Sequence, residues 1–111
     1  MPVANIKGAT GPTGPTGIGF TTSATGTQIS VTGAAADTQL LAANANRRGT
    51  TVNNDSTAVL YLLLADAVSS TTNYSVKVAA AGYIELPYAY TGKVKGIWAS
   101  ATGAARVTEF T

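Results

Sequence analysis

The chain has 111 residues and a formal net charge of +2 at pH 7, contains neither cysteine nor histidine, and is only 11% charged. This length allows one domain, and the charged share is well below the typical value of about 25%. Without His and Cys, the chain lacks the commonest general base, the thiol nucleophile and the commonest transition-metal ligands. No motif for catalysis, for a cofactor or for a metal occurs. We therefore predict a protein that is not an enzyme and binds no cofactor.

The charge and hydropathy patterns also argue against several kinds of partner. The only adjacent basic pair is Arg47 and Arg48, which is too little for the clustered basic surface that nucleic-acid binding requires. The longest apolar run, residues 58–65, is far shorter than the about 20 residues that span a membrane. The first residues, MPVANIK, lack the apolar stretch of a secretion signal. We expect synthesis in the cytoplasm and neither a membrane nor a nucleic-acid partner.

The first organised feature in chain order is the stretch GATGPTGPTG, in which glycine recurs at every third position. This is the Gly-X-Y pattern of collagen, because three wound polyproline chains leave room at their axis only for glycine. The residues that would trimerise this arm are Gly8, Gly11, Pro12, Gly14, Pro15 and Gly17. The alternative is an extended Gly/Pro linker. We take residues 1–23 as a collagen-like arm with its connector and residues 24–111 as the folded domain.

The rest of the chain consists of short runs rich in Val, Ile, Leu, Tyr and Thr, separated by clusters of Gly, Asn, Asp and Ser. This spacing is typical of all-β domains. We predict an antiparallel, jelly-roll-like β-sandwich of about eight short strands. Their expected positions are 27–32, 38–43, 50–53, 58–65, 74–79, 83–87, 93–99 and 105–110. One segment is ambiguous, because the alanines and leucines of residues 34–45 also favour a helix.

The predicted strand 58–65 is apolar on both faces, since Leu60, Leu62 and Leu64 alternate with Val59, Tyr61 and Leu63. Such a strand is covered on both sides. Leu, Ile, Val and Phe together only just exceed the roughly 20% below which chains tend to be disordered, so the core is thin. We therefore expect a partner chain, rather than a loop or the arm, to provide the second cover.

Other residues are candidates for a binding site. The turn expected at Asn53-Asn54-Asp55 could also ligate calcium through its oxygens, but it lacks the alternating acidic spacing of a calcium loop. The C-terminal third is rich in aromatic residues, which either belong to the core or form a platform for sugars or a partner. The residues that we expect to face a partner are Arg47, Arg48, Tyr61, Leu63, Tyr88 and Tyr90.

From Ala42 to its end, the chain carries RRGTTVNNDSTAVLYLLL, AAGYIELPYAYTGKVKGIW and ATGAARVTEF. Together with the short Gly-X-Y arm, these segments resemble the small head decoration, or head-fibre, proteins of tailed bacteriophages. The resemblance implies a homotrimer on the outer surface of the virion that binds the major capsid protein. This arm is shorter than most collagen-like fibre stalks. The alternative is a glycan-binding adhesin, either a phage fibre tip or a collagen-like spore-surface protein, that presents Tyr88, Tyr90 and Trp98 to surface glycans.

Overall fold

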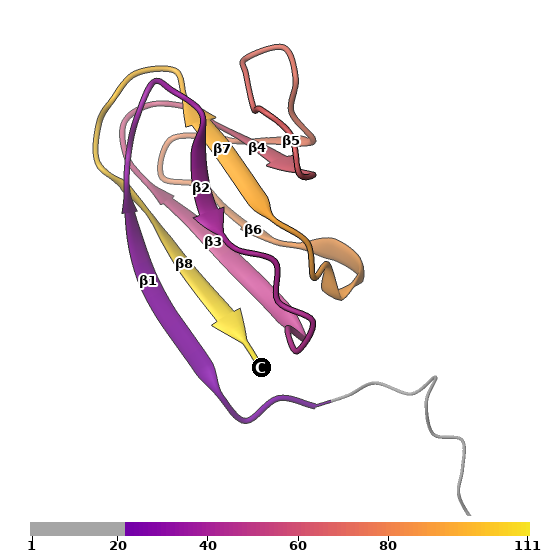
Figure 1. Cartoon of the computed structure of the whole chain (residues 1–111). Helices are drawn as coiled ribbons and strands as arrows, with labels where there is room; N and C mark the ends of the chain where they lie inside the picture. Colours follow the sequence, from indigo (N-terminus) through magenta and orange to yellow (C-terminus); the bar gives the residue numbers. More distant parts are fainter. Residues whose placement is uncertain (1–21) are drawn as a thin grey trace, which may run out of the picture.

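A computed structural model describes residues 22–111, which form eight β-strands in two four-stranded antiparallel sheets and no α-helix (Figure 1). Each strand overlaps one of the eight predicted runs, so the all-β prediction is confirmed. The ambiguous segment 34–45 contains a strand. The elements are β1 (Gly26–Thr32), β2 (Thr38–Leu41), β3 (Gly49–Asp55), β4 (Leu60–Leu64), β5 (Val76–Val78), β6 (Tyr83–Glu85), a 3₁₀-helix η4 (Pro87–Ala89), β7 (Val94–Trp98) and β8 (Ala104–Phe110).

The strand order is β1-β8-β3-β6 in one sheet, called sheet I below, and β2-β7-β4-β5 in the other, called sheet II. Strand β1 therefore pairs with β8, β2 with β7, β3 with β6 and β4 with β5, always antiparallel. This nested pairing is that of an eight-stranded jelly roll, in which two Greek keys wrap around one core. The two sheets face each other as the layers of a sandwich.

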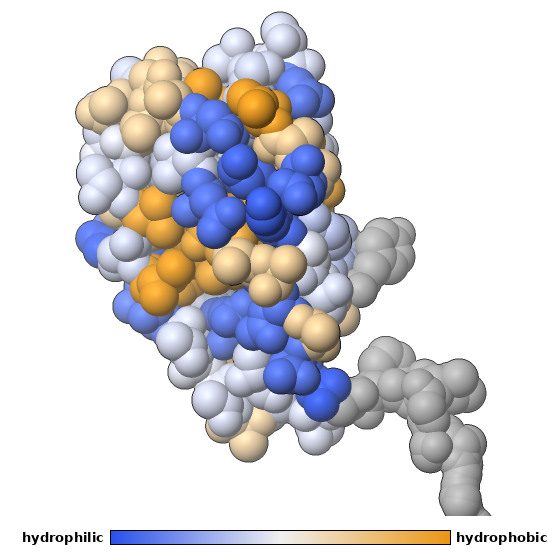
Figure 2. All heavy atoms as spheres, viewed as in Figure 1, coloured by the Kyte–Doolittle hydropathy of each residue, from blue (hydrophilic) through white to orange (hydrophobic). Residues whose placement is uncertain are grey.

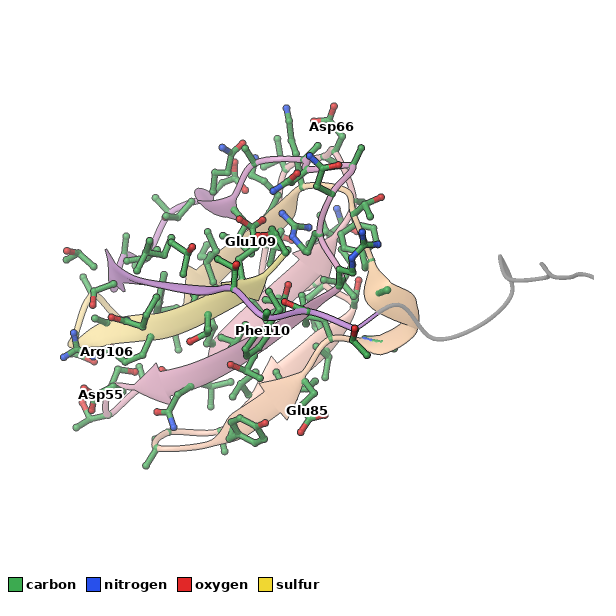
Figure 3. All side chains as sticks on the ribbon, turned by 90° about the horizontal axis from the view of Figure 1, so that it is seen from below. Asp55, Asp66, Glu85, Arg106, Glu109 and Phe110 are labelled. Carbon is green, nitrogen blue, oxygen red and sulfur yellow. The ribbon has the colours of Figure 1, made fainter. Side chains whose placement is uncertain are left out.

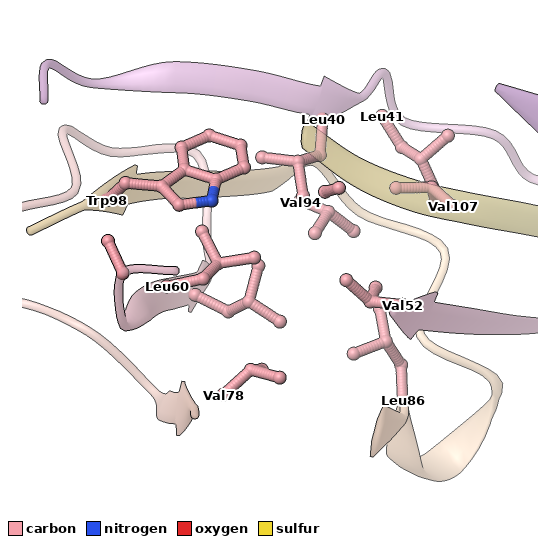
Figure 4. Close-up of a cluster of buried hydrophobic side chains, with 12 residues drawn as sticks. Leu40, Leu41, Val52, Leu60, Val78, Leu86, Val94, Trp98 and Val107 are labelled. Atoms are coloured by element: carbon pink, nitrogen blue, oxygen red, sulfur yellow. The ribbon is translucent and has the colours of Figure 1, made fainter. Parts of the chain in front are cut away.

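The core lies between the sheets, where alternate residues of each strand point inward. In β4, Leu60 and Leu62 are fully buried, and on the facing sheet Val52 and Val107 are fully buried as well. Trp98 is the largest side chain of this core and is 1% exposed. The buried cluster consists of Leu40, Leu41, Val52, Ala58, Leu60, Leu62, Val78, Leu86, Val94, Trp98, Ala105 and Val107 (Figure 4).

Strand β2 buries two consecutive residues, which a regular strand cannot do because its side chains alternate between faces. Its pairing with β7 shifts register between Gln39 and Leu41. The extra residue of this bulge turns both Leu40 (3% exposed) and Leu41 (8% exposed) into the core. The bulge therefore adds one large side chain to a core that the composition leaves thin.

The predicted strand boundaries differ from the structure most clearly in β3. The prediction ended this strand at Asn53 and placed a turn at Asn53-Asn54-Asp55, whereas β3 continues to Asp55. Asparagine and aspartate are typical of turns, but here two inter-sheet contacts of the Asn54 side chain, described below, hold the backbone extended. Both Asn54 and Asp55 pair with residues of β8.

Candidate interaction surfaces

The outer face of sheet I is polar, and its charged side chains Asp55, Glu85 and Arg106 each bond to a neighbouring side chain (Figure 3). Arg106 bonds to Asp55 at 2.9 Å and donates to the Ser30 hydroxyl at 2.8 Å. On the neighbouring strand β6, the hydroxyl of Tyr83 donates to Glu85 at 2.8 Å, and this bond raises the pKa of Tyr83. Tyr83 is 56% exposed. The face therefore offers short hydroxyl and amide groups and one exposed aromatic ring, with little net charge.

Phe110 closes one end of this face. Its ring lies between two glycines of the neighbouring strands, and a Cβ added at Gly26 would be 3.2 Å from the ring, whereas one at Gly49 would be 3.8 Å away. An aromatic ring that covers glycines across strands compensates for their missing side chains. The backbone N–H of Thr111 donates to the carbonyl of Thr25 at 2.9 Å. The segment before β1 thus lies beside the C-terminal end of β8.

The outer face of sheet II carries a cluster of two tyrosines and a lysine, called the Tyr61 cluster below. The rings of Tyr61 and Tyr74 meet edge to face with centroids 5.0 Å apart. The Lys77 ammonium lies 5.8 Å from one ring centroid and 5.9 Å from the other, within the range of a cation–π contact. Both tyrosines are half-buried and Lys77 is exposed. Tyr61 therefore remains available to a partner.

Leu63 lies on this outer face but is only 7% exposed. The connection from β4 to β5, residues 65–75, reaches β2, because the Ser69 N–H and hydroxyl donate to Asp37 at 2.8 and 2.7 Å. Since β7 lies between β4 and β2 in sheet II, this connection crosses the sheet. The prediction that Leu63 faces a partner chain is wrong, because Leu63 is already buried within the single chain.

Asp37 is the anchor of that loop. Besides the two bonds from Ser69, its carboxylate accepts one from the Lys95 ammonium at 2.9 Å. The hydrogen bond from the Ser69 hydroxyl, followed by that from Lys95, lowers the pKa of Asp37 from 3.8 to about 2. The carboxylate is therefore ionised at neutral pH and holds the loop by charge-assisted bonds.

Arg47 is also wrongly predicted as partner-facing, since its side chain is 0% exposed. Its guanidinium donates to Glu109 at 2.8 Å, to the carbonyls of Tyr90 and Gly92 at 3.0 and 2.8 Å, and to the carbonyl of Ala42. The planar fork of arginine suits this set of acceptors. Arg47 ties three segments together inside the domain, whereas the neighbouring Arg48 is exposed.

Among the aromatic residues expected to bind sugars, Trp98 and Tyr90 do not form an exposed platform. Trp98 belongs to the core, and Tyr90 packs against the core while its hydroxyl donates to the Lys93 carbonyl at 2.9 Å. The side chain of Tyr88 lies outside what the structure describes. The glycan-binding alternative therefore loses Trp98, and Tyr90 is held by contacts within the chain.

The arm residues Gly8, Gly11, Pro12, Gly14, Pro15 and Gly17 lie outside the described residues, so their trimerising role stays a prediction. Within residues 22–111, no group of three or more acidic side chains gathers as a metal site would require. No helix in this part of the chain is long and apolar enough to cross a membrane.

All five Asp and Glu side chains accept bonds from donors of the same chain. Beside Asp37, Asp55, Glu85 and Glu109, described above, Asp66 accepts a bond from Lys93 at 2.9 Å. The calcium alternative at Asn53-Asn54-Asp55 is not supported, because Asp55 bonds to Arg106 and the Asn54 oxygen accepts from Ser56 and Trp98. The acidic groups thus serve contacts within the domain.

Asn54, which the sequence pattern placed only in a turn or a calcium loop, is fully buried. Its amide nitrogen donates to the carbonyls of Ala58, Val78 and Ala79 at 2.8, 3.0 and 3.1 Å. Its oxygen accepts from the Ser56 hydroxyl at 2.7 Å and from the indole N–H of Trp98 at 3.2 Å. Asn54 therefore connects sheet I to sheet II. Its only signal in the sequence is an asparagine at an inward position of a strand.

Comparisons with known proteins found no match among family models, curated proteins or solved structures.

Proposed function

We propose that this chain is a structural virion protein, a homotrimer that decorates the outer surface of a bacteriophage capsid by binding the major capsid protein. The proposal starts from the resemblance of residues 42–111 and of the Gly-X-Y arm to phage head decoration proteins. The observation that carries it is the jelly-roll sandwich in which every Asp and Glu side chain serves a contact within the chain. Jelly rolls are common in viral capsid proteins and also in lectins, and the fold supports the proposal by this analogy.

The trimer is supported by the way in which the arm joins the sandwich. The Gly-X-Y triplets precede β1, and the bond from Thr111 to Thr25 holds the start of the domain beside the end of β8. If three arms meet at one axis, the end of each sandwich that carries Phe110 and the start of β1 comes close to that axis. The domains then have a high effective concentration for one another.

Two described surfaces could contact the shell. Arg48 lies exposed on the connection between β2 and β3, and the Tyr61 cluster lies on the outer face of sheet II. Aromatic and arginine side chains are the groups that contribute most to protein interfaces. We propose that the shell binds at one of these two surfaces.

Two measurements test this function. Native mass spectrometry of the full chain is expected to give three times 11.1 kDa, and a stable monomer at micromolar concentration contradicts the trimer. Phage particles that lack the protein are expected to assemble but to release their DNA at a lower temperature, because cementing contacts are missing. If such particles are equally stable but lose attachment to host cells or glycans, the protein is an adhesin.

A further inference from the structure

Strand β1 forms an exposed edge of sheet I, at the left of the sandwich in Figure 1. It is seven residues long and pairs on one side with β8, without any shift in register. Six of its residues are exposed and Val31 is half-buried. Its other side has no neighbouring strand within the described chain, so its backbone can accept a further strand.

The other three edges of the two sheets are each protected against pairing. Strand β2 contains the bulge and directly follows Asp37, and β5 has only three residues with Lys77 at its centre. Strand β6 also has three residues, among them Glu85, and Pro87 follows soon after. Bulges, charges, proline and short length are the usual means by which proteins prevent edge-to-edge association. Strand β1, with the sequence GTQISVT, has none of them.

An apolar side chain accompanies this open edge. Ile29 pairs in register with the buried Val107 and therefore shares the inward side of sheet I, yet it is 37% exposed. Hydrophobic residues gather on the side of the molecule where β1 and β2 border each other (Figure 2). A further strand beside β1 would cover Ile29 while it satisfies the free backbone groups.

We infer that β1 pairs antiparallel with β1 of a second copy of this chain, about a two-fold axis at Ile29. Ile29 is the central residue of β1, so this register uses the whole strand and sets Ile29 opposite Ile29, while Thr27 lies opposite Val31. No charged side chain meets another, because β1 has none. The same surface serves both copies, as a two-fold contact requires, and sheet I continues from one copy into the next.

This contact is independent of the three-fold association that the proposed function assigns to the arm, and it goes beyond that function. One pair of seven-residue strands buries less than the about 1,200 Å² of a stable interface. The contact is therefore weak between free molecules and becomes effective when many copies are held on one surface. On a capsid, it would link neighbouring trimers into a network.

Disulfide crosslinking tests this contact directly, because the natural chain contains no cysteine. In an antiparallel pair, opposite Cα atoms lie about 4.5–5.5 Å apart, which a disulfide can bridge. The full-length I29C variant, oxidised with diamide, is expected to form roughly tenfold more crosslinked dimer than the controls. The controls are V68C and Y83C, whose positions are 67% and 56% exposed. Equal crosslinking of all three variants overturns the inference.

A mixing experiment tests the register. T27C and V31C are expected to crosslink when mixed and not when oxidised separately, because residues 27 and 31 lie opposite each other only in the two-fold register. Crosslinking of each variant with itself indicates random collision and overturns the inference. If I29C crosslinks only after residues 1–21 are removed, that segment of the same chain occupies the edge and the second copy does not. Trp98 fluorescence shows that each variant is folded.

Discussion

Replacing Asn54 with alanine should destabilise the domain more than any other exchange of one asparagine. The change removes the acceptor of the Trp98 indole N–H, and Trp98 is 1% exposed, so water cannot replace the bond. Ala79 keeps another donor, because the Gly82 N–H also bonds to its carbonyl, and the Ser56 hydroxyl, released from Asn54, can donate to the Ala58 carbonyl. The indole N–H is therefore the group most clearly left without a partner.

The size of the effect follows from these contacts. A buried donor without a partner costs about 1–3 kcal/mol, and each lost hydrogen bond costs about 1 kcal/mol more. N54A is therefore expected to lower the free energy of unfolding by about 3 kcal/mol, a large part of the about 5–15 kcal/mol of a typical domain.

Urea unfolding at one fixed protein concentration measures this loss, and the single tryptophan reports it by fluorescence. The matched control is N53A, which changes the adjacent asparagine on the exposed face of β3 and should cost less than about 0.5 kcal/mol. In a double-mutant cycle with W98F, followed by circular dichroism, the two losses should be less than additive. Equal losses for N54A and N53A would refute the role of Asn54.

Three further changes separate internal contacts from exposed surface. R47A should lower the free energy of unfolding by about 3–5 kcal/mol because it breaks a buried ion pair. R48A should change it by less than about 0.5 kcal/mol. Similar urea midpoints for the two variants would contradict the internal role of Arg47. The pKa of Asp37 is lowered to about 2. Its partly exposed carboxylate should therefore add about 1 kcal/mol to the free energy of unfolding above pH 4, and this contribution should be lost as the pH falls toward 2. The stability difference between the natural chain and D37N should therefore shrink over this range, and a constant difference speaks against the anchor. G96A places a Cβ 2.9 Å from a Leu40 methyl and should cost about 1–2 kcal/mol by thermal unfolding, whereas G49A, at 3.8 Å from Phe110, should be nearly neutral.

The strands could be predicted because their signals are local. Alternating apolar residues and the turn clusters between them lie within a few positions of each other, and all eight strands were located in this way. The bulge in β2 was not predicted, because two adjacent leucines fit a buried strand or a helix equally well. The end of β3 was missed because the local preference of asparagine for turns yields here to the bond between Asn54 and Trp98.

The candidate site could be predicted only in part, because its contacts join distant parts of the chain. Arg47 and Glu109 are 62 positions apart, and Ser69 and Asp37 are 32 apart. No local pattern distinguishes the buried Arg47 from the exposed Arg48. A strand that is apolar on both faces predicts a second cover, but it does not distinguish a partner chain from a loop, and Leu63 is already buried within the single chain.

The central claim is that this protein decorates the outside of a capsid as a trimer, and imaging of particles tests it most directly. Electron microscopy should compare virions that carry the protein with otherwise identical virions that lack it. The account predicts difference density on the outer shell at local three-fold positions. The volume of this density should match three copies of the β-sandwich domain. Density at a tail or fibre tip, or no difference at all, would contradict it.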